Sequence, residues 1–138
     1  EVYPGIKQLL RDLIKQGVLC LVATSKPEIY AKKILDYYEL SNYFYYIAGA
    51  NMDGTRTDKA EVIAYALKQI PAEYSNKKVL MVGDRSHDII GAKKNGIDCA
   101  GVLFGYGSRE ELEEAGADFV ADSVEAVRNI VFLNAAKN

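Results

Sequence analysis

The sequence predicts a doubly wound, Rossmann-like α/β fold with a mostly parallel sheet, and three observations support that prediction. Segments with apolar residues at helical spacing alternate along the chain with short apolar runs of strand length. Two of these runs, residues 18–23 and 79–82, are apolar without interruption, which is typical of strands buried on both faces. The chain has 138 residues, 49% of them hydrophobic, so we expect one α/β core domain over residues 1–138.

The first half of the chain is expected to contain three helices and two strands. Pro4 suits a first helical turn and Gly17 a helix end, so the first helix is placed between them. Pro27 begins the second helix after a polar turn at residues 24–26, and Pro71 ends the third helix. The remaining elements are a strand at residues 18–23, an aromatic-rich strand at 43–48, a loop at 49–56 and the third helix at 58–70.

The second half begins with a buried strand at residues 79–82. The polar turn 83–86 leads from this strand into a short helix, which is expected to stop at Gly96. A further strand at 97–103 and a glycine-rich loop at 105–107 follow.

Two helices are expected in the last thirty or so residues, each with its own N-terminal signal. Ser108 and Glu111 form the S-x-x-E pattern of a capping box for the first of them. A short edge strand at residues 119–120 comes next, and Asp122 with Glu125 is expected to cap the last helix.

Charge and hydropathy exclude several classes of protein. Seventeen basic against nineteen acidic residues give a formal net charge of −2, so we expect neither a nucleic-acid partner nor an anionic membrane. The longest apolar runs are far shorter than a membrane span, and residues 1–5 lack the features of a signal peptide. Cys20 and Cys99 lie in apolar surroundings, which favours two buried thiols over a disulfide and the cytoplasm as the compartment.

Function in a doubly wound sheet is expected at the carboxyl ends of the strands, and polar residues gather there. Thr24 and Ser25 follow the first strand, where a hydroxyl and the N–H groups of a helix start can bind an anion. A plain helix N-cap is the alternative interpretation. Lys59 begins the helix after the second strand, where a cation is unfavourable unless an anion lies nearby; a solvated lysine is the alternative.

Asp84 and Asp88 follow the third strand, four positions apart at a strand-to-helix turn. Two carboxylates in that arrangement can converge on one hard cation such as Mg²⁺, or they can stabilise the helix dipole. Phosphoryl transfer mainly needs positioning and neutralisation of charge. A hydroxyl donor, a lysine and two carboxylates at strand ends therefore predict a phosphate site with Mg²⁺.

These segments resemble the motifs of the haloacid dehalogenase-like (HAD) superfamily, specifically its phosphoglycolate-phosphatase-like branch. Residues 22–27 are similar to the second motif of that family, Lys59 to the third, and residues 83–88 to the fourth, G-D-x-x-x-D. Residues 3–17 resemble the segment after the family's cap domain, and residues 101–107 resemble a later strand and loop. The resemblance covers essentially the whole chain.

The resemblance implies a Mg²⁺-dependent phosphatase that hydrolyses small phosphate monoesters through an aspartyl-phosphate. It implies that Thr24 and Ser25 bind the phosphoryl group, with Thr24 and Lys59 as catalytic residues. Asp84 and Asp88 are the implied Mg²⁺ ligands. Arg85 and His87, within the same motif, are interpreted as solvated or peripheral side chains.

The family's first motif, D-x-D-G-T, supplies the nucleophile and the general acid–base, and it is absent from these residues. Residues 51–55 read N-x-D-G-T, but they follow the second motif and place an asparagine where the nucleophile belongs. We interpret them as a turn. This chain alone is therefore expected to be inactive as a phosphatase, and we expect it to be a truncated or proteolysed part of a longer enzyme.

The resemblance also places the nucleophile strand in the middle of the sheet, between the strands that end at Thr24 and Gly83. The predicted core thus lacks its central strand and its cap domain. Three outcomes stay open: the missing segment completes the sheet, a second chain donates a strand, or the two strands pair with each other. Three alternative functions stay open: an inactive phosphate- or metal-binding module, another family hydrolase such as a nucleotidase, and a receiver-like signalling domain.

Overall fold

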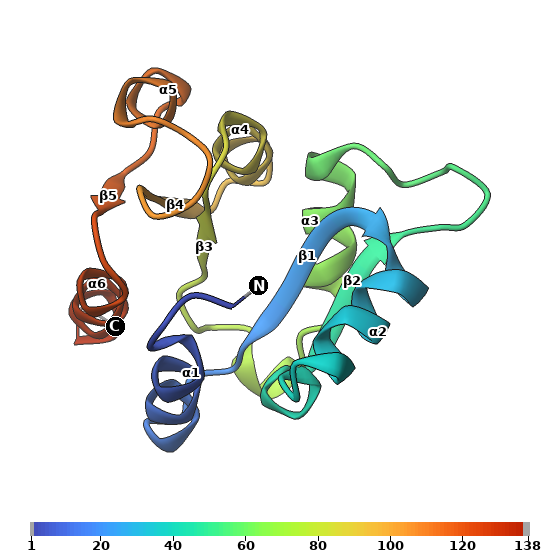
Figure 1. The fold of residues 1–138 in the computed structure, drawn as a ribbon, viewed down its shortest axis with the longest axis horizontal. Helices are drawn as coiled ribbons and strands as arrows, with labels where there is room; N and C mark the ends of the chain where they lie inside the picture. Colours follow the sequence, from blue (N-terminus) through green and yellow to red (C-terminus); the bar gives the residue numbers. More distant parts are fainter. Residues whose placement is uncertain (1, 137–138) are drawn as a thin grey trace. The chain divides into compact units, whose positions relative to one another are not determined.

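The computed structural model describes residues 2–136, and the chain divides into two compact units, the first ending at Ile70 and the second beginning at Pro71 (Figure 1). The single core domain expected over residues 1–138 stays a prediction. The helices and strands are α1 (Ile6–Lys15), β1 (Leu21–Pro27), α2 (Glu28–Tyr37), β2 (Tyr46–Ala50), α3 (Lys59–Lys68), β3 (Leu80–Gly83), α4 (Ser86–Lys94), β4 (Asp98–Val102), α5 (Arg109–Ala115), β5 (Phe119–Ala121) and α6 (Val124–Ala136), with short 3₁₀ helices at Ser41–Tyr43 and Ala72–Tyr74.

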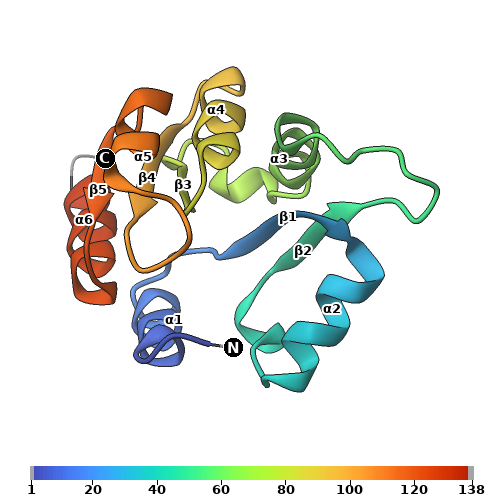
Figure 2. The ribbon, with the colours of Figure 1, turned by 45° about the horizontal axis from the view of Figure 1, so that its top comes forward.

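The first unit is a parallel pair of strands covered by helices. β1 and β2 pair in parallel with Ala23 opposite Ala48. Figure 2 shows α3 on one side of the pair and α2 on the other. Ala48, Val62 and Ala66 form the buried contact between strand and α3. Small residues at this contact let the helix backbone approach the sheet closely.

The first strand begins later and ends later than predicted. The N–H of Val18 bonds the carbonyl of Leu13 and so completes the end of α1, which leaves the ladder to start at Leu21. The register then shifts between Ala23 and Pro27, so residues 24–26 are an irregular part of the strand and not a separate turn.

The second strand also lies further along the chain than residues 43–48. The N–H groups of Tyr43 and Phe44 bond the carbonyls of Leu40 and Ser41, which forms a 3₁₀ turn in place of the predicted strand start. The second strand, β2, therefore covers Tyr46–Ala50.

The second unit has a parallel three-stranded sheet in the order β3-β4-β5. Ile89 and Ala92 of α4, Cys99 of β4 and Leu112 of α5 are fully buried and form its core. Burial of such side chains stabilises the fold by roughly 1.5–3 kcal/mol for each large one. Parallel strands joined by helices confirm the predicted α/β class in both units.

Burial on both faces, predicted for residues 18–23 and 79–82, is wrong for the two strands that these runs form. β1 is half-buried, and Val82 of β3 is 39% exposed. β1 and β3 belong to different sheets, and each is paired on one edge only within residues 2–136. β4 lies between two strands, and Cys99, Ala100 and Val102 within it are buried.

Two helix caps differ from the sequence prediction. Ser108 Oγ accepts the N–H of Glu111 at 3.1 Å, but the Glu111 carboxylate bonds elsewhere, so the capping box is only half formed. In the last helix Ser123 Oγ accepts the N–H of Ala126 at 3.0 Å, so Ser123 takes the capping position predicted for Asp122.

Cys20 and Cys99 are both free thiols, as predicted, although only Cys99 is fully buried. Burial raises the pKa of each thiol above its usual value. None of the helices within residues 2–136 combines the length and the apolar character that crossing a membrane requires.

Candidate functional site

The acidic turn, residues 83–88, lies at the carboxyl end of β3 in the second unit and carries both predicted metal ligands. Asp88 is 4% exposed, and its Oδ2 accepts the backbone N–H groups of Asp84 at 3.1 Å and Arg85 at 3.2 Å. Because Asp88 is the third residue of α4, these bonds satisfy donors at the helix start. Asp84 and Asp88 therefore belong to one hydrogen-bonded turn.

The loop after β4 closes over the first of these aspartates. Asp84 Oδ2 accepts the N–H of Tyr106 at 2.9 Å, and the carbonyl of Asp84 accepts the N–H of Gly107 at 2.8 Å. Asp84 is thus held through its side chain and its backbone by a segment more than twenty residues away.

Three glycines make this packing sterically possible. A Cβ atom on Gly83 would lie 2.4 Å from Oδ2 of Asp88, and one on Gly105 would lie 2.4 Å from Oδ2 of Asp84. A Cβ atom on Gly107 would lie 2.2 Å from the carbonyl oxygen of Asp84. All three distances are far below van der Waals contact, so only glycine fits these positions.

Sequence reasoning missed a second support of the acidic turn. Glu111 Oε2 accepts the N–H of Ser86 at 2.7 Å and Nε of Arg85 at 2.9 Å. These bonds, with that from Ser86 the larger effect, lower the pKa of the Glu111 carboxyl below its usual value. Arg85, interpreted as solvated, is instead paired, and its bond to Glu111 raises the pKa of the guanidinium.

Thr24 and Ser25 lie in the irregular part of β1, in the first unit. The N–H of Lys26 donates to Oγ1 of Thr24 at 3.2 Å, which fixes the hydroxyl as an acceptor in a local turn. A hydroxyl that accepts one bond still carries its own proton for donation to an anion. Thr24 is half-buried and Ser25 is exposed.

Lys59 is the first residue of α3, also in the first unit, and is half-buried. Asp58 precedes it as the N-cap and accepts the N–H of Ala60 at 3.1 Å. Because α3 follows β2 and packs along β1 and β2, its first turn lies toward the carboxyl ends of these strands. The predicted residues thus fall in both units, Thr24, Ser25 and Lys59 in the first and Asp84 and Asp88 in the second, and a hydrogen bond joins the last two.

The N-x-D-G-T stretch at residues 51–55 forms the turn that the sequence predicts. Oδ1 of Asp53 accepts the N–H of Thr55 at 3.0 Å and its hydroxyl at 2.7 Å, and these bonds lower the pKa of Asp53. Nδ2 of Asn51 donates to Oγ1 of Thr55 at 2.9 Å. Gly54 takes the positive φ of 88° that this turn needs.

Arg56, which follows this turn, was not singled out by sequence reasoning. Its side chain is 20% exposed, its Nε donates to the carbonyl of Gly49 at 2.9 Å, and its guanidinium lies 3.7 Å from the ring centre of Tyr65. A single arginine in a loop has no periodicity or spacing that marks it, so the sequence alone offers no signal for this contact.

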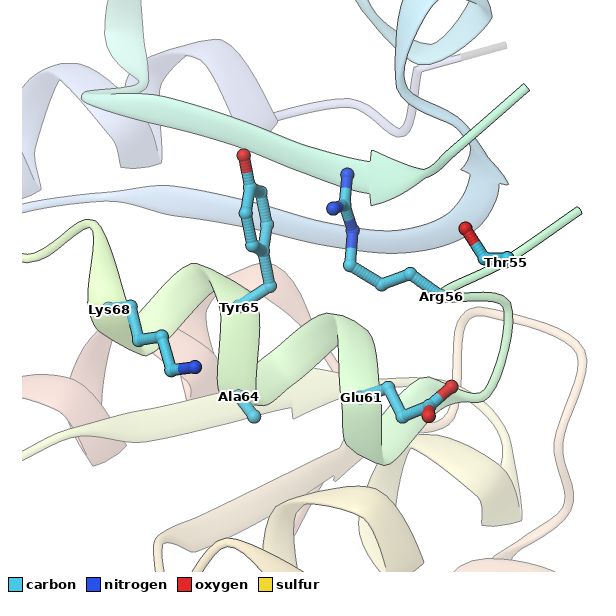
Figure 3. Close-up of a pocket in the computed structure, with 6 residues that line it drawn as sticks. All are labelled: Thr55, Arg56, Glu61, Ala64, Tyr65 and Lys68. Atoms are coloured by element: carbon cyan, nitrogen blue, oxygen red, sulfur yellow. The ribbon is translucent and has the colours of Figure 1, made fainter. Parts of the chain in front are cut away.

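Arg56 and Tyr65 also line a pocket of about 330 Å³ beside α3 in the first unit (Figure 3). In the figure both side chains extend from the loop and the helix toward the strands. The lining residues are Thr55, Arg56, Glu61, Ala64, Tyr65 and Lys68. None of the residues predicted to bind phosphate or metal lines this pocket.

A complete metal site is not formed by the described part of the chain alone. Within residues 2–136, no group of three or more His, Cys, Asp and Glu side chains is placed to hold a metal ion. Asp84 and Asp88 offer carboxylate oxygens, the donors that Mg²⁺ prefers, and Mg²⁺ usually keeps several waters or substrate oxygens as ligands. The acidic turn therefore fits two protein ligands of such an ion.

Comparison with known proteins gives a consistent family. A family model described as haloacid dehalogenase-like hydrolase matches residues 1–102. The chain is 38% identical over 133 residues to a 5'-nucleotidase of Pseudomonas aeruginosa, covering 95% of this chain and 58% of the relative. It is 41% identical over 120 residues to tyrosine-protein kinase PtkA of Mycobacterium tuberculosis, covering 87% and 40%.

A phosphoglycolate phosphatase of Pseudomonas fluorescens is 32% identical over 125 residues, covering 89% of this chain and 44% of the relative. Among solved structures, a predicted phosphatase from Clostridium acetobutylicum matches with a TM-score of 0.88 and 40% identity, covering 96% of this chain and 61% of the other. The chain thus spans about 40–61% of the length of these proteins. These matches confirm the resemblance drawn from the motifs: the chain belongs to the haloacid dehalogenase-like hydrolase family.

Proposed function

We propose that this chain carries the phosphate- and metal-binding residues of a Mg²⁺-dependent phosphatase that acts on small phosphate monoesters. The observation that carries the proposal is the acidic turn at the carboxyl end of β3, in which the Asp88 carboxylate accepts the N–H of Asp84 and the Asp84 carboxylate accepts the N–H of Tyr106. That edge of a parallel sheet is where α/β proteins bind ligands. Membership of a hydrolase family with relatives named phosphatase and nucleotidase supports the same function.

Each residue has a separate task in the proposed site. Thr24 would donate its hydroxyl proton to a phosphoryl oxygen, with Ser25 next to it as a second hydroxyl. Lys59 would hold a positive charge beside the same group. Asp84 and Asp88 would bind Mg²⁺, which when bound supplies neutralisation of the negative charge on the phosphoryl oxygens. Removing one fixed donor of this kind typically lowers the rate about 10²–10³-fold.

We further propose that the covalent step needs an aspartate from outside these 138 residues, which would form the aspartyl-phosphate. The same outside segment, or a second chain, would complete the predicted sheet. The half-buried side chains of β1 and the 39% exposure of Val82 on β3 support this arrangement, because parallel strands are normally covered on both faces.

Metal binding is the direct test of the acidic turn. Titration of the protein with Mg²⁺, followed by calorimetry, should give binding that Asp84→Asn or Asp88→Asn weakens at least tenfold. Asp98→Asn is the matched control, because Asp98 lies at the amino end of β4 and pairs with Lys78 at 3.7 Å. Equal Mg²⁺ affinity in all three variants would contradict the proposed metal site.

The catalytic part of the proposal is tested by comparing two samples. The complete natural protein should hydrolyse p-nitrophenyl phosphate only with Mg²⁺, whereas the isolated chain of 138 residues should not hydrolyse it at an enzymatic rate. Hydrolysis by the isolated chain would contradict the need for an outside nucleophile. Mg²⁺ binding without any hydrolysis by the complete protein would favour an inactive metal-binding module.

A nucleoside monophosphate is the second candidate substrate. It is favoured by the relative named 5'-nucleotidase, which is 38% identical over 95% of this chain. Phosphoglycolate is the first candidate in the branch to which the motifs are similar. The ratio of kcat/KM for a nucleoside monophosphate and for phosphoglycolate, measured on the complete protein, decides between them.

A further inference from the structure

Arg56 has a backbone conformation that is unfavourable for its residue type. Its φ angle is 56°, and Glu39, with φ 59°, is the other non-glycine residue with positive φ within residues 2–136. The left-handed region is sterically unfavourable for a residue with a Cβ atom, and neither arginine nor glutamate is among the types that visit it readily. Such a conformation persists when contacts of the surrounding structure hold it in place, and functional sites are where it is often found.

The contacts that hold Arg56 come from three different elements of the first unit. Nε donates to the carbonyl of Gly49 in β2 at 2.9 Å, and Nη2 lies 3.7 Å from Oε1 of Glu28, the first residue of α2. The face of the guanidinium lies 3.7 Å from the ring centre of Tyr65 in α3. Only an arginine can combine a forked donor set with a flat cationic face in this way.

The partners of Arg56 are themselves joined. Oε1 of Glu28 accepts the N–H of Gly49 at 3.2 Å, so one carboxylate oxygen lies beside both the strand and the guanidinium. The hydroxyls of Tyr65 and Tyr46 are 2.8 Å apart, and this bond is the main reason that the pKa of Tyr46 is raised to about 12. The network therefore ties α2, β2 and α3 together around one side chain.

Gly49 makes the strand ends close enough for this network. A Cβ atom at this position would lie 2.7 Å from the Cα of Glu28 and 2.7 Å from the carbonyl oxygen of Lys26. The end of β2 is thus in direct contact with the residues that follow Thr24 and Ser25. Arg56 also binds the end of β2, because its Nε donates a hydrogen bond to the carbonyl of Gly49.

From this geometry we infer that Arg56 is a positioning residue that fixes Lys59 relative to Thr24. The inference rests on the proposed function, in which both of these residues bind the phosphoryl group. Arg56 lies three positions before Lys59, and its guanidinium reaches Glu28, four positions after Thr24. Its side chain is engaged by Gly49, Glu28 and Tyr65, so it acts through Lys59 and does not touch the substrate itself.

A double-mutant cycle in the complete natural protein tests the inference. Arg56→Lys keeps the charge but loses the fork and the flat face, and should lower kcat/KM for p-nitrophenyl phosphate and weaken inhibition by inorganic phosphate, each about ten- to a hundredfold. In a Lys59→Met background, the same Arg56→Lys change should cost less than about twofold, because the group that it positions is gone.

Two outcomes of this cycle separate the inference from the function on which it rests. If Lys59→Met lowers activity but Arg56→Lys costs the same factor in both backgrounds, the positioning role is wrong while the proposed function stands. If Lys59→Met leaves both activity and phosphate inhibition unchanged, the proposed phosphate site is wrong, and the inference falls with it.

Glu39→Gly is the matched control for the backbone. Glu39 is exposed, shares the positive φ of Arg56, and has no contact with the Arg56 network among the bonds described above. Arg56→Gly and Glu39→Gly relieve the same backbone strain, but only Arg56→Gly should lower kcat/KM. A loss of similar size in Glu39→Gly would show that any change of turn stability has this effect and would overturn the inference.

Amide hydrogen exchange gives a readout that does not depend on activity. The N–H of Ala60 bonds Oδ2 of Asp58 in the first turn of α3, and the N–H of Val62 bonds the carbonyl of Asp58. Arg56→Lys should speed exchange of these two amides about tenfold while exchange of Ala66, deeper in α3, stays unchanged. Unchanged exchange at Ala60 and Val62 would overturn the positioning role.

Discussion

The carboxylate of Glu111 accepts the backbone N–H of Ser86 at 2.7 Å, and this bond joins helix α5 to the first residue of α4, 25 positions away in the sequence. The same oxygen accepts Nε of Arg85 at 2.9 Å. The acidic turn is therefore held from outside by α5 as well as from within by Asp88. Support of this kind orients the groups that contact a metal ion, although it does not itself contact the ion.

Glu111→Gln is expected to weaken Mg²⁺ binding about tenfold while the protein stays folded. A glutamine can still accept one bond from Ser86, but it loses the charge that pairs with Arg85, so the acidic turn becomes less rigid. Calorimetric titration with Mg²⁺ measures the change. Glu113→Gln is the control, because Glu113 lies on the same helix and pairs with Arg109 on its exposed surface; a similar loss there would contradict the prediction.

Gly105→Ala is expected to abolish Mg²⁺ binding at millimolar concentrations. The new Cβ would lie 2.3 Å from Cβ and 2.4 Å from Oδ2 of Asp84, so the carboxylate must move. Overpacking of this kind typically costs about 1–3 kcal/mol of folding free energy. Gly96→Ala is the control, because it introduces backbone strain without displacing a carboxylate. Gly96 has φ 70°, and no atom lies within 4 Å of the new Cβ. That variant should lose stability in thermal unfolding but keep its Mg²⁺ affinity.

The class of fold and the position of most elements could be predicted because they depend on local patterns. A strand begins within each of the continuous apolar runs 18–23 and 79–82, at Leu21 and at Leu80, and Gly17 and Gly96 do take positive φ at helix ends. Burial could not be predicted in the same way. Whether other elements cover a strand such as β3 depends on its neighbours in space, which the local sequence does not specify. Val82 on β3 is exposed although it lies in an apolar run.

The acidic turn could also be predicted, since Asp84 and Asp88 lie close together in the sequence. The bonds that support it could not, because Tyr106 and Glu111 reach it from segments more than twenty residues away. The S-x-x-E pattern predicts a local capping box for Glu111, and the sequence pattern is satisfied equally well there. A short-range pattern therefore identified the right residue but the wrong partner.

Asp118→Asn is expected to remove part of the acid sensitivity of the second unit. Asp118 Oδ2 accepts the N–H of Cys99 at 2.9 Å, and this bond is the main cause that lowers the pKa of Asp118 below its usual 3.8. A carboxyl with a lowered pKa in the folded protein adds stability above its unfolded pKa and loses it as the pH falls through the folded pKa. An asparagine cannot titrate, so it lacks this contribution at every pH.

Thermal unfolding measured between pH 7 and pH 2 checks this prediction. The unaltered protein should have the higher Tm at pH 7, and the difference from Asp118→Asn should shrink below about pH 4, where the unfolded carboxyl becomes protonated. Asp122→Asn is the control, because Asp122 is exposed and has no bond to the sheet among those described. A Tm difference that stays constant with pH would contradict the assigned role of the Asp118 charge.

Leu112→Ala is expected to destabilise the second unit by about 2–5 kcal/mol, because Leu112 is fully buried among Ile89, Ala92 and Cys99. The same change is also expected to affect the acidic turn. Leu112 packs over Gly101, where an added Cβ would lie 2.8 Å from Leu112 Cδ1, and Gly101 is paired with Gly83 in the sheet.

The control is Leu133→Ala, at a site 64% exposed on α6, which should lower the free energy of unfolding by well below 1 kcal/mol. Chemical unfolding measures both free energies. Equal losses in the two variants would contradict the core described here, whereas a large loss in Leu112→Ala with weaker Mg²⁺ binding below the unfolding transition would connect that core to the site.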